Sequence, residues 1–230
     1  EVEKMSKSKW NVVSPDDIVD QYGADCLRLY EMFLGPLEQS KPWNTNGISG
    51  VSNFLRKLWR LYHTKDMTFA VSKETPSAAE LKSLHKTIKK AEEDIERFSF
   101  NTSVSTFMIC VNELTDLKCN KRAILEPLAI VLSAYAPHIT EELWKLLGHK
   151  ESITKATFPQ WNKDFLVEDS FEYPISVNGK TRFKINISLS LTKEEIEKEV
   201  MSNEEMHKFL NGGQPKKVIV VPGRIVNIVV

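Results

Sequence analysis

Cysteine and histidine are scarce in this sequence. Its 230 residues include three cysteines, Cys26, Cys110 and Cys119, and five scattered histidines. The cysteines stand too far apart for a CxxC metal knuckle, and their odd number argues against a disulfide framework. The sequence therefore predicts no metal site, and its free thiols suit the reducing cytoplasm.

Net charge and long apolar runs are also missing. Thirty-one basic residues balance thirty-one acidic ones, whereas a protein that binds nucleic acid through a general electrostatic field is usually basic. Any RNA-binding surface must therefore be local. No apolar run approaches the roughly 20 residues of a membrane span, and no signal peptide opens the sequence. Because the chain starts at Glu1 with a charged motif at its edge, we expect a piece of a longer protein without a membrane segment.

Helical periodicity dominates the first two thirds of the chain. Ser14, Pro15 and two aspartates predict a helix that Gly23 stops, and a second short helix follows over 24–34. Apolar residues then recur every three or four positions for about a hundred residues. The expected features are an apolar stripe over 51–62, a capping box at Ser77, a seam that runs through Ile95 to Phe98, a helix capped by Asn101, a helix from Ala123 towards Ala136 that Pro137 breaks, and a helical segment ending at Gly148.

The pattern changes near residue 170. Two alternating segments, 171–177 and 183–187, flank Asn178-Gly179, which is typical of a tight hairpin turn. A capping box at Thr192 opens a charged helix, Gly212-Gly213 ends the helical stretch, and the runs 218–221 and 225–230 are expected to be buried strands. The sequence thus predicts a mainly α fold, a helical bundle followed by a small α+β domain. The expected domains are 1–45, 46–165 and 166–230, with the linker near Trp161–Glu168.

The segment Lys4-Met5-Ser6-Lys7-Ser8 is the most informative part of the sequence. Two ammonium groups and two hydroxyls in a loop before helices can fold over a triphosphate and donate charge-assisted hydrogen bonds. Composition alone would favour an ordinary solvated loop. The pentapeptide, however, reproduces the signature loop of class I aminoacyl-tRNA synthetases.

Further segments extend this resemblance over nearly the whole chain. Tyr22-Gly23-Ala24-Asp25 resembles the junction that follows this loop in the Leu/Ile/Val/Met subgroup. Lys41-Pro42-Trp43-Asn44 resembles leucyl enzymes specifically, and 136–144 resembles a motif of the helical anticodon-binding domain. Val177-Asn178-Gly179-Lys180 resembles the small C-terminal domain of bacterial-type leucyl enzymes. Trp10 departs from the usual glycine, and we expect it to stiffen the loop or to find a packing partner.

The resemblance implies the C-terminal part of a bacterial-type leucyl-tRNA synthetase, from the signature loop onward. Such an enzyme activates leucine with ATP, accompanied by Mg²⁺, and transfers it to tRNA(Leu). By resemblance, Lys7 contacts the ATP phosphates and stabilises the adenylate-forming transition state, Lys4 supports it, and Ser6 and Ser8 shape the ATP loop. ATP and leucine would bind through a catalytic domain that this sequence lacks. We therefore expect the chain alone to be inactive and to bind no cofactor tightly, and the whole enzyme to be a cytoplasmic monomer.

Local basic groups indicate where RNA could bind. Arg56, Lys57 and Arg60 lie on the polar side of an expected helix. Lys180, Arg182 and Lys184 alternate along the hairpin, so we expect them on one face, opposite Phe183 and Ile185, and expect the bases of the last strands, Lys216, Lys217 and Arg224, to join them. An ordinary solvated surface is an equal alternative for these groups.

Two other functions remain open at this point. A non-catalytic RNA-binding module would share the bundle and the basic hairpin but would not need the signature loop. An isoleucyl- or valyl-tRNA synthetase would share the loop and the bundle, and the amino-acid pocket that separates these enzymes is not in this sequence.

Overall fold

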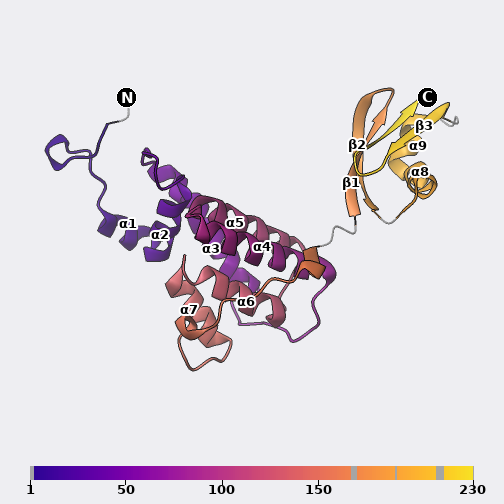
Figure 1. Ribbon diagram of the computed structural model, residues 1–230. Helices are drawn as coiled ribbons and strands as arrows, with labels where there is room; N and C mark the ends of the chain where they lie inside the picture. The colour runs from indigo at the N-terminus through magenta and orange to yellow at the C-terminus, as the bar shows by residue number, and fades with distance from the viewer. Residues whose placement is uncertain (1–2, 167–169, 190, 211–214, 230) are drawn as a thin grey trace. The chain divides into compact units, whose positions relative to one another are not determined.

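The computed structural model describes residues 3–166, 170–189, 191–210 and 215–229. The chain divides into two compact units, Glu1–Leu166 and Val167–Val230 (Figure 1). The first is helical and the second combines a four-stranded sheet with helices, which confirms the predicted fold class. The expected stop at Gly212-Gly213, the last strand residue Val230 and part of the expected linker lie outside the described residues. None of the described helices has the length and apolarity that crossing a membrane requires.

The helical unit is built around α5. This helix packs against α2, α3 and α4, while α6 contacts α4 and α7 (Figure 1). Its buried side chains, including Val104, Phe107 and Leu114, join those of its neighbours in one core. The bounds of the elements are α1 Pro15–Tyr22, α2 Ala24–Phe33, α3 Ile48–Leu61, α4 Ala78–Glu96, α5 Phe100–Asp116, α6 Arg122–Leu132 and α7 Pro137–Leu146, with short 3-10 turns at Lys7–Lys9, Thr45–Gly47, Ile153–Lys155 and Lys163–Leu166.

Several predicted helix signals are confirmed. Pro15 is the first residue of α1, and Gly23 ends that helix with a positive φ of 89°. The capping box at Ser77 forms, with Ser77 Oγ accepting from the Glu80 backbone N–H and the Glu80 carboxylate accepting from that of Ser77. Pro137 is the first residue of α7, where its missing N–H costs no helical hydrogen bond, although the preceding helix already ends at Leu132 and not at this proline.

Three helix predictions are wrong at their ends. The seam of α4 does not reach Phe98, because the chain turns there with a positive φ of 55° and leaves that ring and Ile95 exposed. The buried Asp94 takes the inner position instead and accepts a 2.7 Å hydrogen bond from Thr102 Oγ1. As a result α5 begins at Phe100, and Asn101 lies inside its first turn instead of capping it. Helix α6 stops at Leu132, where the following residues turn back to its last carbonyls.

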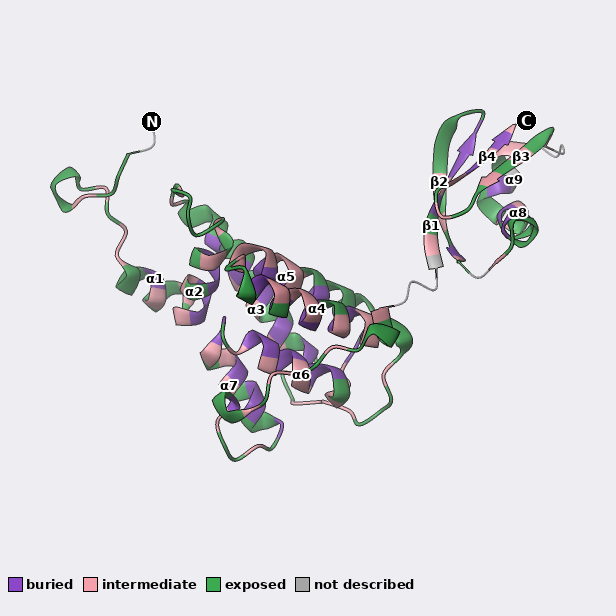
Figure 2. Ribbon diagram, viewed as in Figure 1, coloured by how far each residue is buried: buried purple, intermediate pink, exposed green. Residues whose placement is uncertain are grey.

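The second unit is a sheet of order β2-β1-β4-β3 in which β1 and β4 are parallel and the other neighbours are antiparallel. The apolar faces of α8 and α9 cover one side of it, so Tyr173, Ile175, Val226 and Ile228 form a core with Ile196 and Val200 (Figure 2). The order β-β-α-α-β-β follows the prediction. Its elements are β1 Ser170–Val177, β2 Lys180–Ser188, α8 Lys193–Ser202, α9 Glu204–Leu210, β3 Lys217–Val221 and β4 Ile225–Val229.

The last two strands are not buried on both faces, which corrects the prediction. Strand β3 lies at an edge, and its alternate residues Ile219 and Val221 are exposed. Only Val226 and Ile228 of β4 are buried. Helices lie against a single face, so an apolar run of five residues here has one covered side and one open side.

Candidate functional site

The signature loop Lys4–Ser8 is bonded at two points by Asn11, which follows it in the sequence. Asn11 Oδ1 accepts from the Ser6 backbone N–H at 2.8 Å, and Asn11 Nδ2 donates to the Lys4 carbonyl at 3.4 Å. The hydroxyls of Ser6 and Ser8 lie 2.8 Å apart, and Lys7–Lys9 form a short 3-10 turn. Each of these contacts, like that between Lys9 and Glu3, joins two residues of the segment 3–11.

The lysines of the loop differ in whether they are paired. Lys9 Nζ lies 3.1 Å from Glu3 Oε2. Lys4 and Lys7 are exposed, and neither ammonium has an ion pair or hydrogen bond with any described residue. The two lysines predicted to act on ATP are therefore the two that can bind a new anion without breaking an existing pair.

Trp10 does not pack. It is 94% exposed, so of the two expected alternatives, a stiffer loop or a packing partner, the second is excluded. The residue also has a positive φ of 56° at the end of the 3-10 turn. Glycine adopts this conformation without the steric cost that other residues bear, about 1–2 kcal/mol. The geometry thus explains why glycine would suit this position.

The basic residues of α3 fall into two groups. Arg56 and Arg60, one helical turn apart, both line an open groove of about 480 Å³. Lys57 is turned away from this groove and donates a 2.8 Å hydrogen bond to Asn112 Oδ1 of α5. The structure therefore brings two of the three predicted RNA-binding residues together and separates the third.

The basic residues of the β1–β2 hairpin do not share a face of the sheet. Ile175 pairs with Phe183 and Ser176 with Thr181, which leaves Arg182 as the extra residue of a β-bulge. A bulge shifts the alternation by one position, so the expectation of a single basic face is wrong. The guanidinium carbon of Arg182 lies 5.6 Å from the ring centre of Phe209 in α9, on the helix-covered side.

The two lysines of the hairpin lie on opposite faces. Lys180 pairs with the buried Val177, whereas Lys184 pairs with Pro174. Directly opposite residues share a face, so Lys180 lies on the covered side and Lys184 on the open side. Lys184 Nζ also contacts Glu172 Oε2 at 2.7 Å, while the ammonium of Lys180 has no hydrogen-bond or ion-pair partner among the described residues.

The basic residues of the last two strands lie at both ends of the sheet. Lys216 and Lys217 stand where β3 begins, and Lys217 pairs with Val229. Arg224 follows β3, next to the pair of Val221 and Ile225, so it lies about 13 Å further along the strand direction. All three are exposed.

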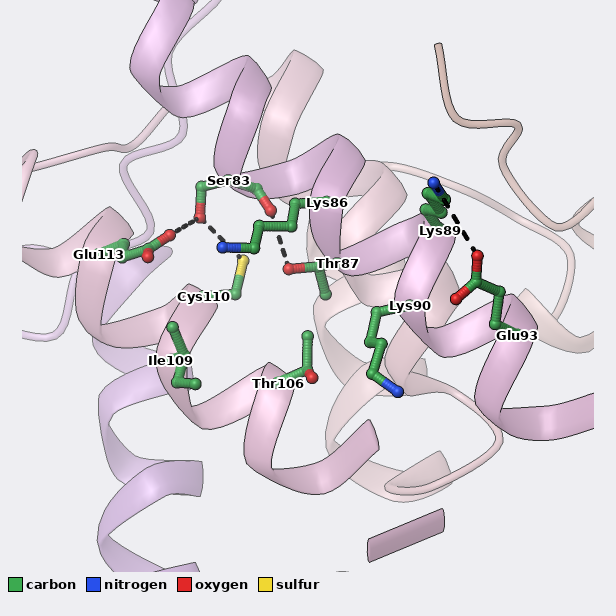
Figure 3. Close-up of a pocket in the computed structure, with 10 residues that line it drawn as sticks. All are labelled: Ser83, Lys86, Thr87, Lys89, Lys90, Glu93, Thr106, Ile109, Cys110 and Glu113. Carbon is green, nitrogen blue, oxygen red and sulfur yellow. Dashed lines mark hydrogen bonds and ion pairs between the residues drawn. The ribbon is translucent and has the colours of Figure 1, made fainter. Parts of the chain in front are cut away.

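A further pocket of about 300 Å³ opens between α4 and α5 (Figure 3). Its lysines are largely engaged, since Lys89 lies 4.0 Å from Glu93 and Lys90 pairs with Asp94. Ser83 Oγ donates to Glu113 Oε2 at 2.6 Å, and burial raises the pKa of the Cys110 thiol above its ordinary value. The pocket therefore holds neither a reactive thiolate nor a group of unpaired cations. Within the described ranges, no three His, Cys, Asp or Glu side chains come together as a metal site.

Two polar contacts that organise the helical unit were not expected from the sequence. The buried Asp25 carboxylate accepts from the backbone N–H groups of His138 and Ile139 and contacts His138 Nδ1 at 2.8 Å, so it caps α7. The buried Glu80 carboxylate contacts Lys121 Nζ through both oxygens, at 2.8 and 2.9 Å. Glu80 and Lys121 lie 41 positions apart in the sequence, so no local pattern predicts their contact. The capping box marks Glu80 alone.

Comparison with protein families gives two matches. Residues 80–198 match the family described as "Anticodon-binding domain of tRNA ligase", which is just over half of the chain. Residues 1–41 match "tRNA synthetases class I (I, L, M and V)", and this range contains the loop Lys4–Ser8 and the junction after it.

The chain is similar over its whole length to bacterial leucine–tRNA ligases. The leucine–tRNA ligase of Cytophaga hutchinsonii is 66% identical over 229 residues, 100% of this chain and 25% of that protein. That of Christiangramia forsetii is 65% identical over 229 residues, 100% of this chain and 24% of that protein. The chain thus spans about a quarter of the length of these curated relatives.

A solved structure resembles the chain as well. It is the ternary complex of Agrobacterium radiobacter K84 agnB2 LeuRS with tRNA and LeuAMS, at a TM-score of 0.67 and 28% identity over 98% of this chain and 31% of that one. The chain therefore belongs to the leucyl-tRNA synthetase family of class I tRNA ligases, and it corresponds to the C-terminal part of the bacterial members.

Proposed function

We propose that this chain supplies the ATP loop and the tRNA-binding part of an enzyme that activates leucine with ATP and transfers it to tRNA(Leu). The observation that carries the proposal is the state of Lys7. Its ammonium is exposed and unpaired among the described residues, in a loop whose hydrogen bonds are internal. A cation held in this way can meet the charge that develops on the phosphates as pyrophosphate leaves.

The other residues of the loop have supporting parts in the proposal. Lys4 adds a second free ammonium, and the hydroxyls of Ser6 and Ser8 lie close enough to bond each other and to turn towards a phosphate. ATP and leucine would be held by the catalytic part of the enzyme. The described part of the chain offers no cluster of carboxylates for Mg²⁺, so Mg²⁺ would arrive with the ATP phosphates.

Binding of tRNA is the second part of the proposal. The similar Agrobacterium structure is named as a complex with tRNA, and the matched family is an anticodon-binding domain. Candidate contacts on this chain are the exposed basic residues Arg56, Arg60, Lys180, Lys216, Lys217 and Arg224. Lys57 and Arg182 are instead engaged with Asn112 and Phe209. Such an enzyme would work as a monomer in the cytoplasm.

The test compares two lysines of the same loop in the full-length enzyme. Lys7→Ala is expected to slow ATP–pyrophosphate exchange by about 10²–10³, the scale for removing one transition-state donor. Lys9→Ala is the matched control, because its ammonium is already paired with Glu3 and its loss should change the rate little. Equal rates for the Lys7→Ala enzyme and the wild type would contradict the role of Lys7.

A further inference from the structure

The groove beside α3 combines an apolar floor with a charged rim. It lies between the end of α1, the outer face of α3, the turn that follows α3 and the start of α7. Leu55, Trp59 and Ile139 belong to its lining and are packed against the bundle core. The full lining is Gln21, Tyr22, Ser52, Leu55, Arg56, Trp59, Arg60, Met67 and Ile139. A hollow of about 480 Å³ is in the range that binds small, partly apolar ligands.

The two arginines on the rim are not neutralised. Neither the Arg56 nor the Arg60 guanidinium has an ion pair, a hydrogen bond or an aromatic partner among the described residues. Two other arginines of the same unit are engaged, since Arg122 Nε lies 2.7 Å from Glu126 and Arg28 donates to the Ala134 carbonyl. No carboxylate lines the groove either. Its occupant should therefore carry negative charge on one side.

The geometry points to an unpaired nucleotide of RNA in this groove, with its phosphates on Arg56 and Arg60 and its base on the apolar floor. This inference rests on the proposed function, because tRNA is the RNA that the enzyme would hold. Arginines one turn apart are about 6 Å apart along the helix, which suits neighbouring phosphates of one strand.

The apolar floor is what separates this site from a simple phosphate contact. Paired bases are stacked inside a duplex, which presents phosphates and hydroxyls to a protein but few base faces. An unstacked base can lie against an apolar or aromatic surface, and such contacts are tolerant of sequence. The side chains of Gln21 and Ser52 have no hydrogen-bond partner among the described residues, so they can bond the edge of the base.

The test uses labelled RNA and three forms of the 230-residue chain. Fluorescence anisotropy would measure binding of a tRNA(Leu) transcript, of a fully paired RNA hairpin and of the same hairpin with one bulged nucleotide. The variants are the Arg56→Ala/Arg60→Ala double substitution and Lys57→Ala. Lys57 is the matched control, since it carries the same charge on the same helix but contacts Asn112. All three side chains are exposed, and circular dichroism would check that the fold is kept.

The wild type should bind the bulged hairpin more tightly than the paired one. The double variant should lose this preference and bind tRNA about tenfold more weakly or worse, while Lys57→Ala stays close to the wild type. Equal binding of both hairpins by the wild type, or equal losses in both variants, would overturn the inference. If the wild type binds tRNA and the double variant binds it as well, this inference alone fails. If the wild type binds no tRNA, the proposed function fails with it.

Discussion

The helical unit and the sheet unit contain the same capping box in different surroundings. Ser77 and Glu80 begin α4, and Thr192 and Glu195 begin α8, with the same pair of reciprocal backbone hydrogen bonds. Glu80 is buried and held by Lys121, whereas Glu195 is exposed and bonds only its own helix end. An identical local motif therefore stabilises one helix end in the second unit and links two distant segments in the first.

The basic runs of the two units differ in a similar way. On α3 the helical periodicity survives in the structure, so Arg56 and Arg60 lie on one side of the helix and line the same groove. On β2 one extra residue breaks the period, and Lys180 and Lys184 end on opposite faces. A helix spreads its side chains over every direction and tolerates small irregularities. A strand has only two faces, so a single bulge exchanges them.

The largest expected effect concerns the buried capping box. Glu80→Ala removes the ion pair with Lys121 and one half of the box, and we expect a loss of about 3 kcal/mol in the free energy of unfolding of the helical unit. Urea unfolding followed by tryptophan fluorescence measures this unit alone, because every tryptophan of the chain precedes residue 167.

The control for this substitution is Glu195→Ala in the other box. Its carboxylate bonds only Thr192 at the surface, so hydrogen exchange should show a clearly smaller loss of protection in α8 than Glu80→Ala causes in α4. Similar losses in both helices would mean that burial and Lys121 add nothing to the motif, and the contrast between the two boxes would be wrong.

A pH titration should sharpen the same contrast. Burial acts to raise the pKa of Glu80, but hydrogen bonds from Lys121 and from Ser77 lower it to about 2, below its ordinary value of 4.5. A carboxyl with a lowered pKa stabilises the fold fully above about pH 4.5, and this stability disappears as the pH falls towards 2. The difference corresponds to about 3 kcal/mol at most.

The measurement is the free energy of unfolding of the wild type and of Glu80→Gln at several pH values. The gap between them should be widest at neutral pH and should close between about pH 4.5 and pH 2. A gap that stays constant over this range would show that the charge of Glu80 does not contribute, and that only its hydrogen bonds do.

Much of the fold could be predicted from local signals, since Pro15, Gly23, the two boxes and Asn178-Gly179 act within a few residues of themselves. The signature loop likewise could be found from five adjacent residues. Other features depend on contacts between distant segments. The cap that Asp25 forms on α7 joins positions 113 and 114 residues apart, and no local pattern announces it.

Errors in the prediction arose where periodicity was extended too far. The apolar period extends to Phe98, whereas α4 ends at Glu96 and the buried Asp94 is bonded to Thr102 of the next helix. The sequence of the hairpin predicts alternation without a break, whereas Arg182 is an extra residue in the structure. The spacing of apolar residues predicts neither hydrogen bonds between distant polar side chains nor single inserted residues.

The smallest expected effect tests the two faces of the hairpin. Lys180→Ala should lower the slope of log affinity for tRNA against log salt by about one, because a free ammonium releases about one counterion when it meets a phosphate. Lys184→Ala is the matched control on the same strand, and its effect on the slope should be smaller because its ammonium is paired with Glu172 at 2.7 Å on the opposite face. A larger effect of Lys184 than of Lys180 would place RNA on the open face of the sheet. Equal effects would show that the bulge has no consequence for binding and that all positive charges of the hairpin attract the RNA alike.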